Sequence, residues 1–326
     1  MRRRLLIAAL GGPALAAARA AAQAPQKRMP VVGFLGATSP EALQTPLVAF
    51  HQGLAQTGHV EGRDVAIEYR WAQEQYDRLP AIAVELVHRD VTVIVAATLP
   101  SALAAKAATT TKPIVFFSGG DPVEQGLVAS LNRPGGNLTG ACVFINDLGP
   151  KQLELLHEAA PGAAAIGFLA NPNNPNAGQQ LKGMRDAAGA AGKRIIALEA
   201  RLASDIDGAI ARLAEQHGDA LIVAADPFLG TQFERIVALA TGRRIAVVSG
   251  RLFAQAGGLI GYGNRVEDAY REVGVYTGRI LNGERPADLP VVRATKFDLV
   301  VNLKTARALG LTIPPSILAR ADEVIE

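Results

Sequence analysis

The chain has 326 residues, of which 49% are hydrophobic and 19% charged, which is enough apolar material for two folded domains and excludes a disordered chain. Its net charge of +3 comes from the first 24 residues, which hold four arginines and no acidic residue; the remaining residues carry 29 basic and 30 acidic side chains. The composition therefore does not indicate binding to nucleic acid. The single cysteine, Cys142, excludes an internal disulfide and a lipid anchor after the N-terminal apolar stretch.

Residues 1–24 have the layout of a secretory signal peptide. Arg2, Arg3 and Arg4 precede an apolar stretch over residues 5–18, and Ala22-Gln23-Ala24 ends a run of small residues that suits cleavage. The stretch is shorter than the roughly 20 residues that a membrane span requires. Because Pro25 disfavours cleavage directly after Ala24, we expect the segment to be removed a few residues earlier, by the secretory or the twin-arginine route, and the mature protein to be periplasmic.

The two halves of the chain repeat one order of short apolar runs. Gly33-Phe34-Leu35 returns as Gly167-Phe168-Leu169, residues 93–98 return as 221–226, and residues 113–119 return as 245–250. Strands are predicted at 31–35, 65–69, 91–96, 114–117, 166–169, 194–198, 221–224, 245–248, 259–262 and 297–303. Helices are predicted at 43–56, 78–88, 101–108, 177–191, around 210–213, 233–240, 266–281 and 304–309.

This alternation of strands and helices predicts an α/β protein with two doubly wound parallel-sheet lobes and a ligand cleft between them. We expect residues 29–143 plus 254–284 to form the N-terminal lobe. Residues 144–253 plus 285–326 are expected to form the C-terminal lobe.

The motifs of common enzyme and cofactor sites are missing from the sequence. There is no Gly-x-Gly-x-x-Gly or Walker A loop after a strand, and no Gly-x-Ser-x-Gly elbow. The five histidines, at positions 51, 59, 88, 157 and 217, do not have the spacing of metal ligands. We therefore expect no cofactor, no metal and no catalytic residue.

Ligands of open parallel sheets bind outside the carboxyl ends of the strands, so the residues at those ends are the candidate site. Hydroxyl groups at helix starts suit a ligand carboxylate, and a carboxylate at a strand end suits an ammonium, so the two lobes together suit an amino acid. For several of these residues a turn or a helix cap is an equally good interpretation, whereas Thr98 and Asp226 hold equivalent places in the two repeats and favour function. The candidate ligand-binding residues are Thr38, Ser39, Thr98, Leu99, Ser101, Ser118, Gly119, Asp121, Asn171, Asn174, Asp226, Ser249 and Tyr262.

Several longer motifs resemble those of ABC-transporter substrate-binding proteins, in the group described as tryptophan/tyrosine transport system binding components. The resemblance covers essentially the whole mature chain. It rests on Val60-Glu61-Gly62-Arg63-Asp64, Ile67-Glu68-Tyr69-Arg70-Trp71, Tyr76-Asp77-Arg78-Leu79-Pro80, Gly120-Asp121-Pro122-Val123, residues 133–140, residues 302–306 and residues 309–326. It implies a type I periplasmic-binding fold, in which two lobes joined by three crossovers close on a ligand.

The resulting prediction is a non-catalytic, monomeric receptor that delivers its ligand to an ABC permease in the inner membrane. The expected ligand is a small amino-acid-like molecule, such as an aromatic or branched amino acid or a small carboxylate. A sensor that presents its ligand to a membrane signalling partner fits the sequence as well. An enzyme acting in the cleft would require a catalytic pair that the sequence does not display. A transcription regulator would require a DNA-binding segment where the signal peptide lies.

Overall fold

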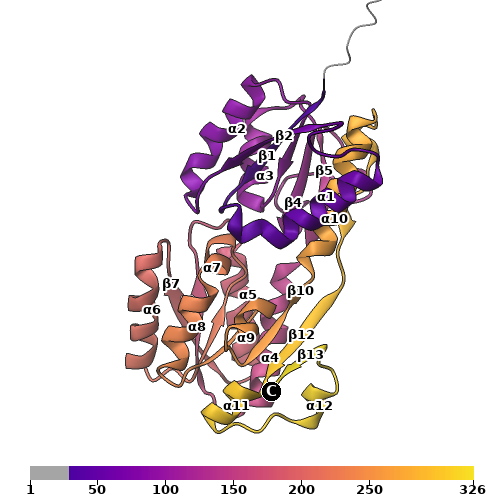
Figure 1. Cartoon of the computed structure of the whole chain (residues 1–326). Coiled ribbons are helices and arrows are strands. Elements are labelled where there is room, and N and C mark those ends of the chain that lie inside the picture. Colours follow the sequence, from indigo (N-terminus) through magenta and orange to yellow (C-terminus); the bar gives the residue numbers. More distant parts are fainter. Residues whose placement is uncertain (1–28) are drawn as a thin grey trace, which may run out of the picture.

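The computed structural model describes residues 29–326, which form two α/β lobes stacked end to end (Figure 1). The predicted signal peptide lies outside these residues. None of the helices within them is both long and apolar enough to cross a membrane. Both lobes are built from β-α repeats whose strands are short buried runs of Val, Ile, Leu, Phe and Ala, as is typical of parallel sheets with helices on both faces.

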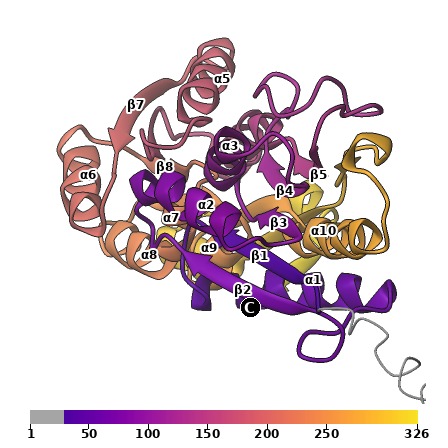
Figure 2. The same cartoon turned by 90° about the horizontal axis from the view of Figure 1, so that it is seen from above.

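The first lobe contains a six-stranded sheet in the order β11-β5-β4-β3-β1-β2. Helices α1 and α10 cover one face of this sheet, and α2 and α3 cover the other (Figure 2). Its elements are β1 (Val31–Gly36), η2 (Glu41–Leu43), α1 (Gln44–Gln56), β2 (Ala66–Trp71), η3 (Tyr76–Arg78), α2 (Leu79–His88), β3 (Val93–Ala96), α3 (Leu99–Ala108), β4 (Ile114–Gly119), β5 (Leu138–Val143), α10 (Val266–Leu281), η5 (Pro286–Asp288) and β11 (Val292–Arg293).

The second lobe contains a seven-stranded sheet in the order β13-β12-β10-β9-β8-β6-β7. Its elements are η4 (Ile145–Asp147), α4 (Leu148–Ala159), β6 (Ala165–Ala170), α5 (Ala177–Ala190), β7 (Arg194–Glu199), α6 (Ala203–Glu215), β8 (Ala220–Val223), α7 (Pro227–Thr231), α8 (Phe233–Thr241), β9 (Ala246–Ser249), α9 (Arg251–Gln255), β10 (Ile260–Asn264), β12 (Phe297–Asn302), α11 (Leu303–Leu309), α12 (Pro315–Leu318) and β13 (Glu323–Ile325).

The chain passes between the lobes three times: after β5, after β10 and after β11. The passages lie together, because the backbone N–H of Arg265 donates to Lys296 O over 3.1 Å and that of Ala294 donates to Cys142 O over 2.9 Å. These three segments form the hinge. Strand β12 enters the second sheet directly from the first lobe, so it runs antiparallel to β10, while the pairs formed by β6, β7, β8 and β9 are all parallel.

Strand pairing differs from the expected lobe boundaries in two places. Strand β10 was expected in the N-terminal lobe, but it pairs with β9 and β12 in the second sheet. Strand β11 was expected in the C-terminal lobe, but it pairs with β5 in the first sheet. The chain therefore changes lobe after residue 264 and again after residue 293. The reason is the strand pairing: β10 belongs to the second sheet and β11 to the first.

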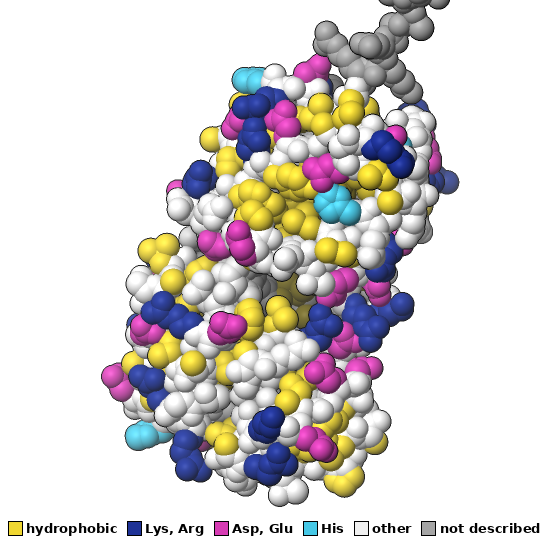
Figure 3. Space-filling model, viewed as in Figure 1, with side chains coloured by type: hydrophobic (Ala, Val, Ile, Leu, Met, Phe, Trp, Pro, Cys, Tyr) yellow, Lys and Arg dark blue, Asp and Glu magenta, His cyan; other side chains and the backbone are white. Residues whose placement is uncertain are grey.

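The two lobes lie one above the other in the space-filling view (Figure 3). On the face shown, Lys and Arg side chains are interspersed with Asp and Glu over both lobes, so no single sign of charge dominates it. Apolar side chains gather on the upper lobe around its edge strand β2, where the half-buried rings of Tyr69 and Trp71 stack with centroids 6.1 Å apart.

Candidate functional site

The carboxyl ends of β1 and β3 carry the first candidate residues. Thr38 follows β1 and is only 2% exposed, and its hydroxyl has no hydrogen-bond partner in the described residues. Ser39 beside it is half-buried. Leaving a buried hydroxyl unpaired lowers the stability of the fold by about 1–3 kcal/mol. A ligand that pairs with the Thr38 hydroxyl would recover this free energy.

Helix α3 starts at the cleft directly after β3. Thr98 is its N-cap and accepts a hydrogen bond from the backbone N–H of Ser101 over 3.3 Å, and the two hydroxyls lie 2.9 Å apart. Thr98, Leu99 and Ser101 are all buried. At this helix start Pro100 has no N–H and the Ser101 N–H is capped by Thr98, so the N–H of Leu99 and the two hydroxyls are the groups that could hold an anion.

The end of β4 is tied to the second lobe. The buried Ser118 hydroxyl donates to Gln125 Oε1 over 2.5 Å, and Gln125 Nε2 donates to Asn176 Oδ1 over 2.9 Å. Asn176, the N-cap residue of α5, also donates through its amide to the carbonyl of Gly119. Asp121 accepts from the backbone N–H of Val123 over 2.8 Å, so in the described structure it serves the turn.

In the second lobe, Asp226 lies between the end of β8 and the start of α7. It is 8% exposed and caps α7, accepting the backbone N–H of Leu229 on Oδ1 over 2.8 Å. Its Oδ2 accepts the amide of Asn174 over 2.8 Å, and Asn171 approaches both oxygens at 3.4 Å. Burial raises the pKa of this carboxyl above its ordinary 3.8, and the hydrogen bonds from Leu229 and Asn174 act in the opposite direction. Oδ1, with one short hydrogen bond, still has room for another donor.

Tyr76 of the first lobe reaches the same carboxylate. Its hydroxyl donates to Asp226 Oδ2 over 3.0 Å and accepts the backbone N–H of Phe228 over 3.1 Å. Together with the bonds between Asn176 and β4, this contact joins the lobes across the cleft.

The last two candidates take different positions. Ser249 donates from its buried hydroxyl to Val223 O over 3.0 Å and so connects β9 to β8. Tyr262 stacks on Phe297 with ring centroids 5.6 Å apart and an interplanar angle of 6°. Both rings belong to an apolar cluster at the hinge that also contains Phe117, Val143, Ile145, Leu148, Ala225 and Ala294, and this cluster draws side chains from both lobes.

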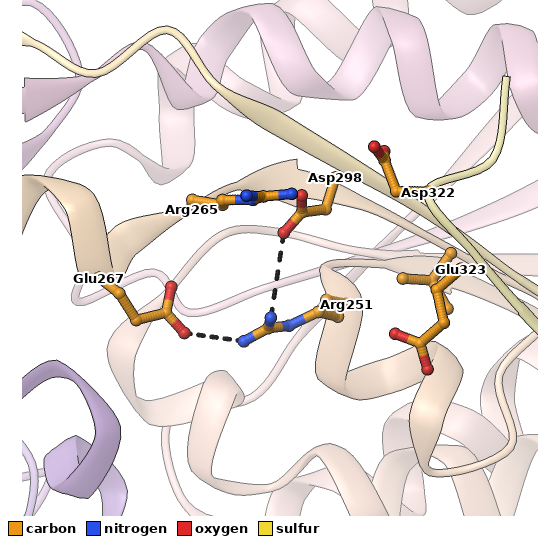
Figure 4. A pocket seen from close by; sticks show the side chains of 7 residues that line it. Arg251, Arg265, Glu267, Asp298, Asp322 and Glu323 are labelled. Carbon is orange, nitrogen blue, oxygen red and sulfur yellow. Dashed lines mark hydrogen bonds and ion pairs between the residues drawn. The ribbon is translucent and has the colours of Figure 1, made fainter.

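A charged cavity of about 250 Å³ lies beside the hinge (Figure 4). Arg251 at the start of α9 pairs with Glu267 of α10 over 2.7 Å and lies 3.9 Å from Asp298. Arg265 pairs with Asp298 over 2.6 Å. Because α10 packs on the first lobe, the pair of Arg251 with Glu267 is a further contact between lobes, although exposed ion pairs contribute only about 0–1 kcal/mol each.

The hinge also holds polar atoms without partners. The amide nitrogen and oxygen of Asn264, at the end of β10, and the amide oxygen of Asn146, in the first crossover, are buried and unpaired. With the hydroxyl of Thr38, these unpaired buried atoms lie at three places: after β1, in the first crossover and at the end of β10. Within residues 29–326, no group of three or more His, Cys, Asp or Glu side chains is arranged to hold a metal ion.

Comparison with known proteins identifies the family. The family model for "ABC transporter substrate binding protein" matches residues 28–325. The chain belongs to this family. Its members are extracytoplasmic binding proteins and not enzymes, which confirms the resemblance, the fold and the non-catalytic function expected from the sequence.

Three relatives illustrate the similarity. A "Tyrosine-binding protein" of Clostridioides difficile (strain R20291) is 27% identical over 263 residues, which are 80% of this chain and 75% of that protein. The structure of an ABC domain from Streptococcus pneumoniae in complex with L-Trp is 25% identical, covers 91% of this chain and 99% of its own, and has a TM-score of 0.83. A conserved domain protein from Vibrio cholerae is 27% identical, covers 91% of this chain and 100% of its own, and also has a TM-score of 0.83.

The arrangement of the lobes is more similar to that of the complex with L-Trp than to that of a ligand-free, open relative, and it is called closed below. A ligand-free, open structure of an adhesive substrate-binding protein from Clostridium difficile is 26% identical and covers 91% of this chain and 99% of its own, yet its TM-score is only 0.63. The complex with L-Trp has nearly the same identity and a much higher score. The hydrogen bonds that cross between the lobes here agree with a closed arrangement.

The structure brings Asn171, Asn174 and Asp226 together, and it places Thr98 with Ser101 at one helix start. Sequence reasoning did not select Tyr76, Gln125 or Asn176. The sequence did carry one signal for Tyr76, because it begins one of the motifs that resemble the family. Asn176 precedes a predicted helix, which is the position of an N-cap.

Proposed function

We propose that this protein captures an aromatic amino acid between its lobes and delivers it to an ABC importer in the inner membrane, after export and removal of its signal peptide. The carboxylate of the ligand would bind at the start of α3, where Thr98 and Ser101 lie, and the ammonium would bind the free position on Asp226 Oδ1. The apolar cluster at the hinge, with the stacked rings of Tyr262 and Phe297, suits the aromatic side chain. Two relatives support this class of ligand, since one is named for tyrosine and the other was solved with L-Trp.

The observation that carries the proposal is the complementarity of the two cleft edges. The first lobe offers the hydroxyls of Thr98 and Ser101 and the N–H of Leu99, whereas the second offers the buried carboxylate of Asp226. A zwitterion satisfies both edges, and it can do so only when the lobes are closed, so binding shifts the open–closed equilibrium toward closure.

Calorimetric titration of residues 26–326, refolded to remove carried-over ligand, tests this assignment. The ligands are L-tryptophan, tryptamine, which lacks the carboxylate, and indole-3-propionate, which lacks the ammonium. We expect L-tryptophan to bind at one site and both analogues to bind at least tenfold more weakly.

The variant Asp226→Asn separates the two contacts. It should weaken L-tryptophan at least tenfold more than indole-3-propionate, because only the first ligand has an ammonium. Equal losses for the two ligands would contradict the role of Asp226, and no binding of any aromatic amino acid would contradict the ligand class.

A further inference from the structure

One tyrosine belongs to the cores of both lobes. Tyr76 opens η3, just after the edge strand β2, and its ring packs against the apolar cluster of the first lobe that contains Leu79. The same ring packs against the cluster of the second lobe that contains Phe228 and Leu229. A side chain shared between two cores stabilises one relative position of the lobes.

The hydroxyl of Tyr76 is fully used in this position. It has one proton to donate, which goes to Asp226 Oδ2 over 3.0 Å, and it accepts the backbone N–H of Phe228 over 3.1 Å. That N–H belongs to the first turn of α7, where Asp226 caps only Leu229. The hydroxyl therefore satisfies a second free N–H group of the helix start.

The phenol keeps its proton under all ordinary conditions. Burial and the neighbouring Asp226 carboxylate raise the pKa of Tyr76 far above its usual 10. The hydroxyl is consequently protonated at neutral pH and available as a donor to Asp226.

We propose that Tyr76 is an interlobe latch, meaning that its hydroxyl, held by Asp226 and Phe228, stabilises the closed arrangement before any ligand enters. Separating the lobes breaks both hydrogen bonds and both sets of ring contacts. The latch thus sets the closed fraction of the free protein, and the apparent affinity for a ligand scales with that fraction, whatever the ligand is. Tyr76 is a positioning residue, since it acts on the closure and not on the ligand.

The test measures the lobes directly and without ligand. Val84→Cys in α2 and Leu202→Cys before α6 replace exposed side chains on different lobes and accept a fluorophore pair, while the fully buried Cys142 stays unlabelled. Single-molecule energy transfer then gives the ratio of closed to open molecules.

Tyr76→Phe keeps the ring and removes only the hydroxyl. We expect the closed-to-open ratio of the free protein to fall about tenfold. Tyr276→Phe is the matched control, because the hydroxyl of Tyr276 donates to Pro290 O over 2.6 Å within the first lobe. In this variant the closed-to-open ratio should change less than twofold.

With L-tryptophan, or with any other ligand found, Tyr76→Phe should weaken binding by the same factor for every ligand, chiefly through faster dissociation. An unchanged closed-to-open ratio would overturn the latch, and so would a free wild-type protein without a closed population. Failure of every ligand to bind would overturn the proposed function alone, since the ratio is measured in the free protein.

Discussion

Helices α1 and α10 of the first lobe cross with their backbones in close approach. Helix α10 begins directly after the second hinge segment. A Cβ atom on Gly274 would stand 2.1 Å from Phe50 O and 2.8 Å from Leu54 N. A Cβ atom on Gly53 would stand 1.9 Å from Arg271 O. These neighbours are backbone atoms, so the two helices would have to separate by about 1 Å or more to restore an ordinary contact.

Gly274→Ala should therefore destabilise the first lobe. Alanine favours the helix by about 1 kcal/mol relative to glycine, but overpacking costs about 1–3 kcal/mol and more where backbone meets backbone. We expect a net loss of about 2 kcal/mol, which corresponds to a urea midpoint lower by about 1 M. Trp71, the only tryptophan of the chain, lies in this lobe, so its fluorescence reports the unfolding there.

Gly208→Ala in α6 is the control, because a Cβ atom at that position meets nothing within 4 Å. It should stabilise the protein by about 0.5–1 kcal/mol. The reasoning fails if Gly274→Ala unfolds at or above the wild-type midpoint, since the helices would then have room that the structure denies them.

Two of the remaining predictions concern the site, and one concerns Cys142 in β5. Thr98→Ala should lower the free energy of unfolding by about 1 kcal/mol through loss of the α3 N-cap, measured by urea unfolding; an unchanged value would show that the cap contributes nothing. Burial raises the pKa of Asp226, and a protonated carboxyl cannot pair with an ammonium, so the affinity for L-tryptophan should rise as the pH rises through that pKa. Asp226→Asn should remove this pH dependence of the affinity. If the dependence persists in the variant, it belongs to another group. Burial raises the pKa of the Cys142 thiol to about 12, so a thiol reagent at pH 8 should label the unfolded chain but not the native one, and rapid labelling of the native protein would contradict the burial.

The fold was predictable where local pattern and tertiary structure agree. Strands such as β1 and β8 are continuous apolar runs that end in small or polar residues, and the repeat placed them in two lobes. Strand β5 was not predicted as a strand, because Thr139 and Gly140 interrupt the apolar pattern at its start. Strand β11 has two residues, which is too short to give a period.

The site was predictable only in part, for a physical reason. Helix starts after strands can be read locally, and this led to Thr98 and Asp226. The contact of Tyr76 with Asp226 joins residues 150 positions apart in different lobes, so no local pattern contains it. Ser249 shows the opposite case, since its place at a strand end suggested a ligand contact, but its hydroxyl binds the neighbouring strand.

The thermal unfolding midpoint of residues 26–326, stripped of carried-over ligand, tests the central claim most directly when measured with and without L-tryptophan, L-tyrosine and L-phenylalanine. An aromatic amino acid at 100 times its dissociation constant should stabilise the folded protein by about 2.7 kcal/mol and raise the midpoint by about 5 °C or more, whereas L-aspartate should not. No rise with any of the three aromatic amino acids would contradict the claim that this protein closes on an aromatic amino acid.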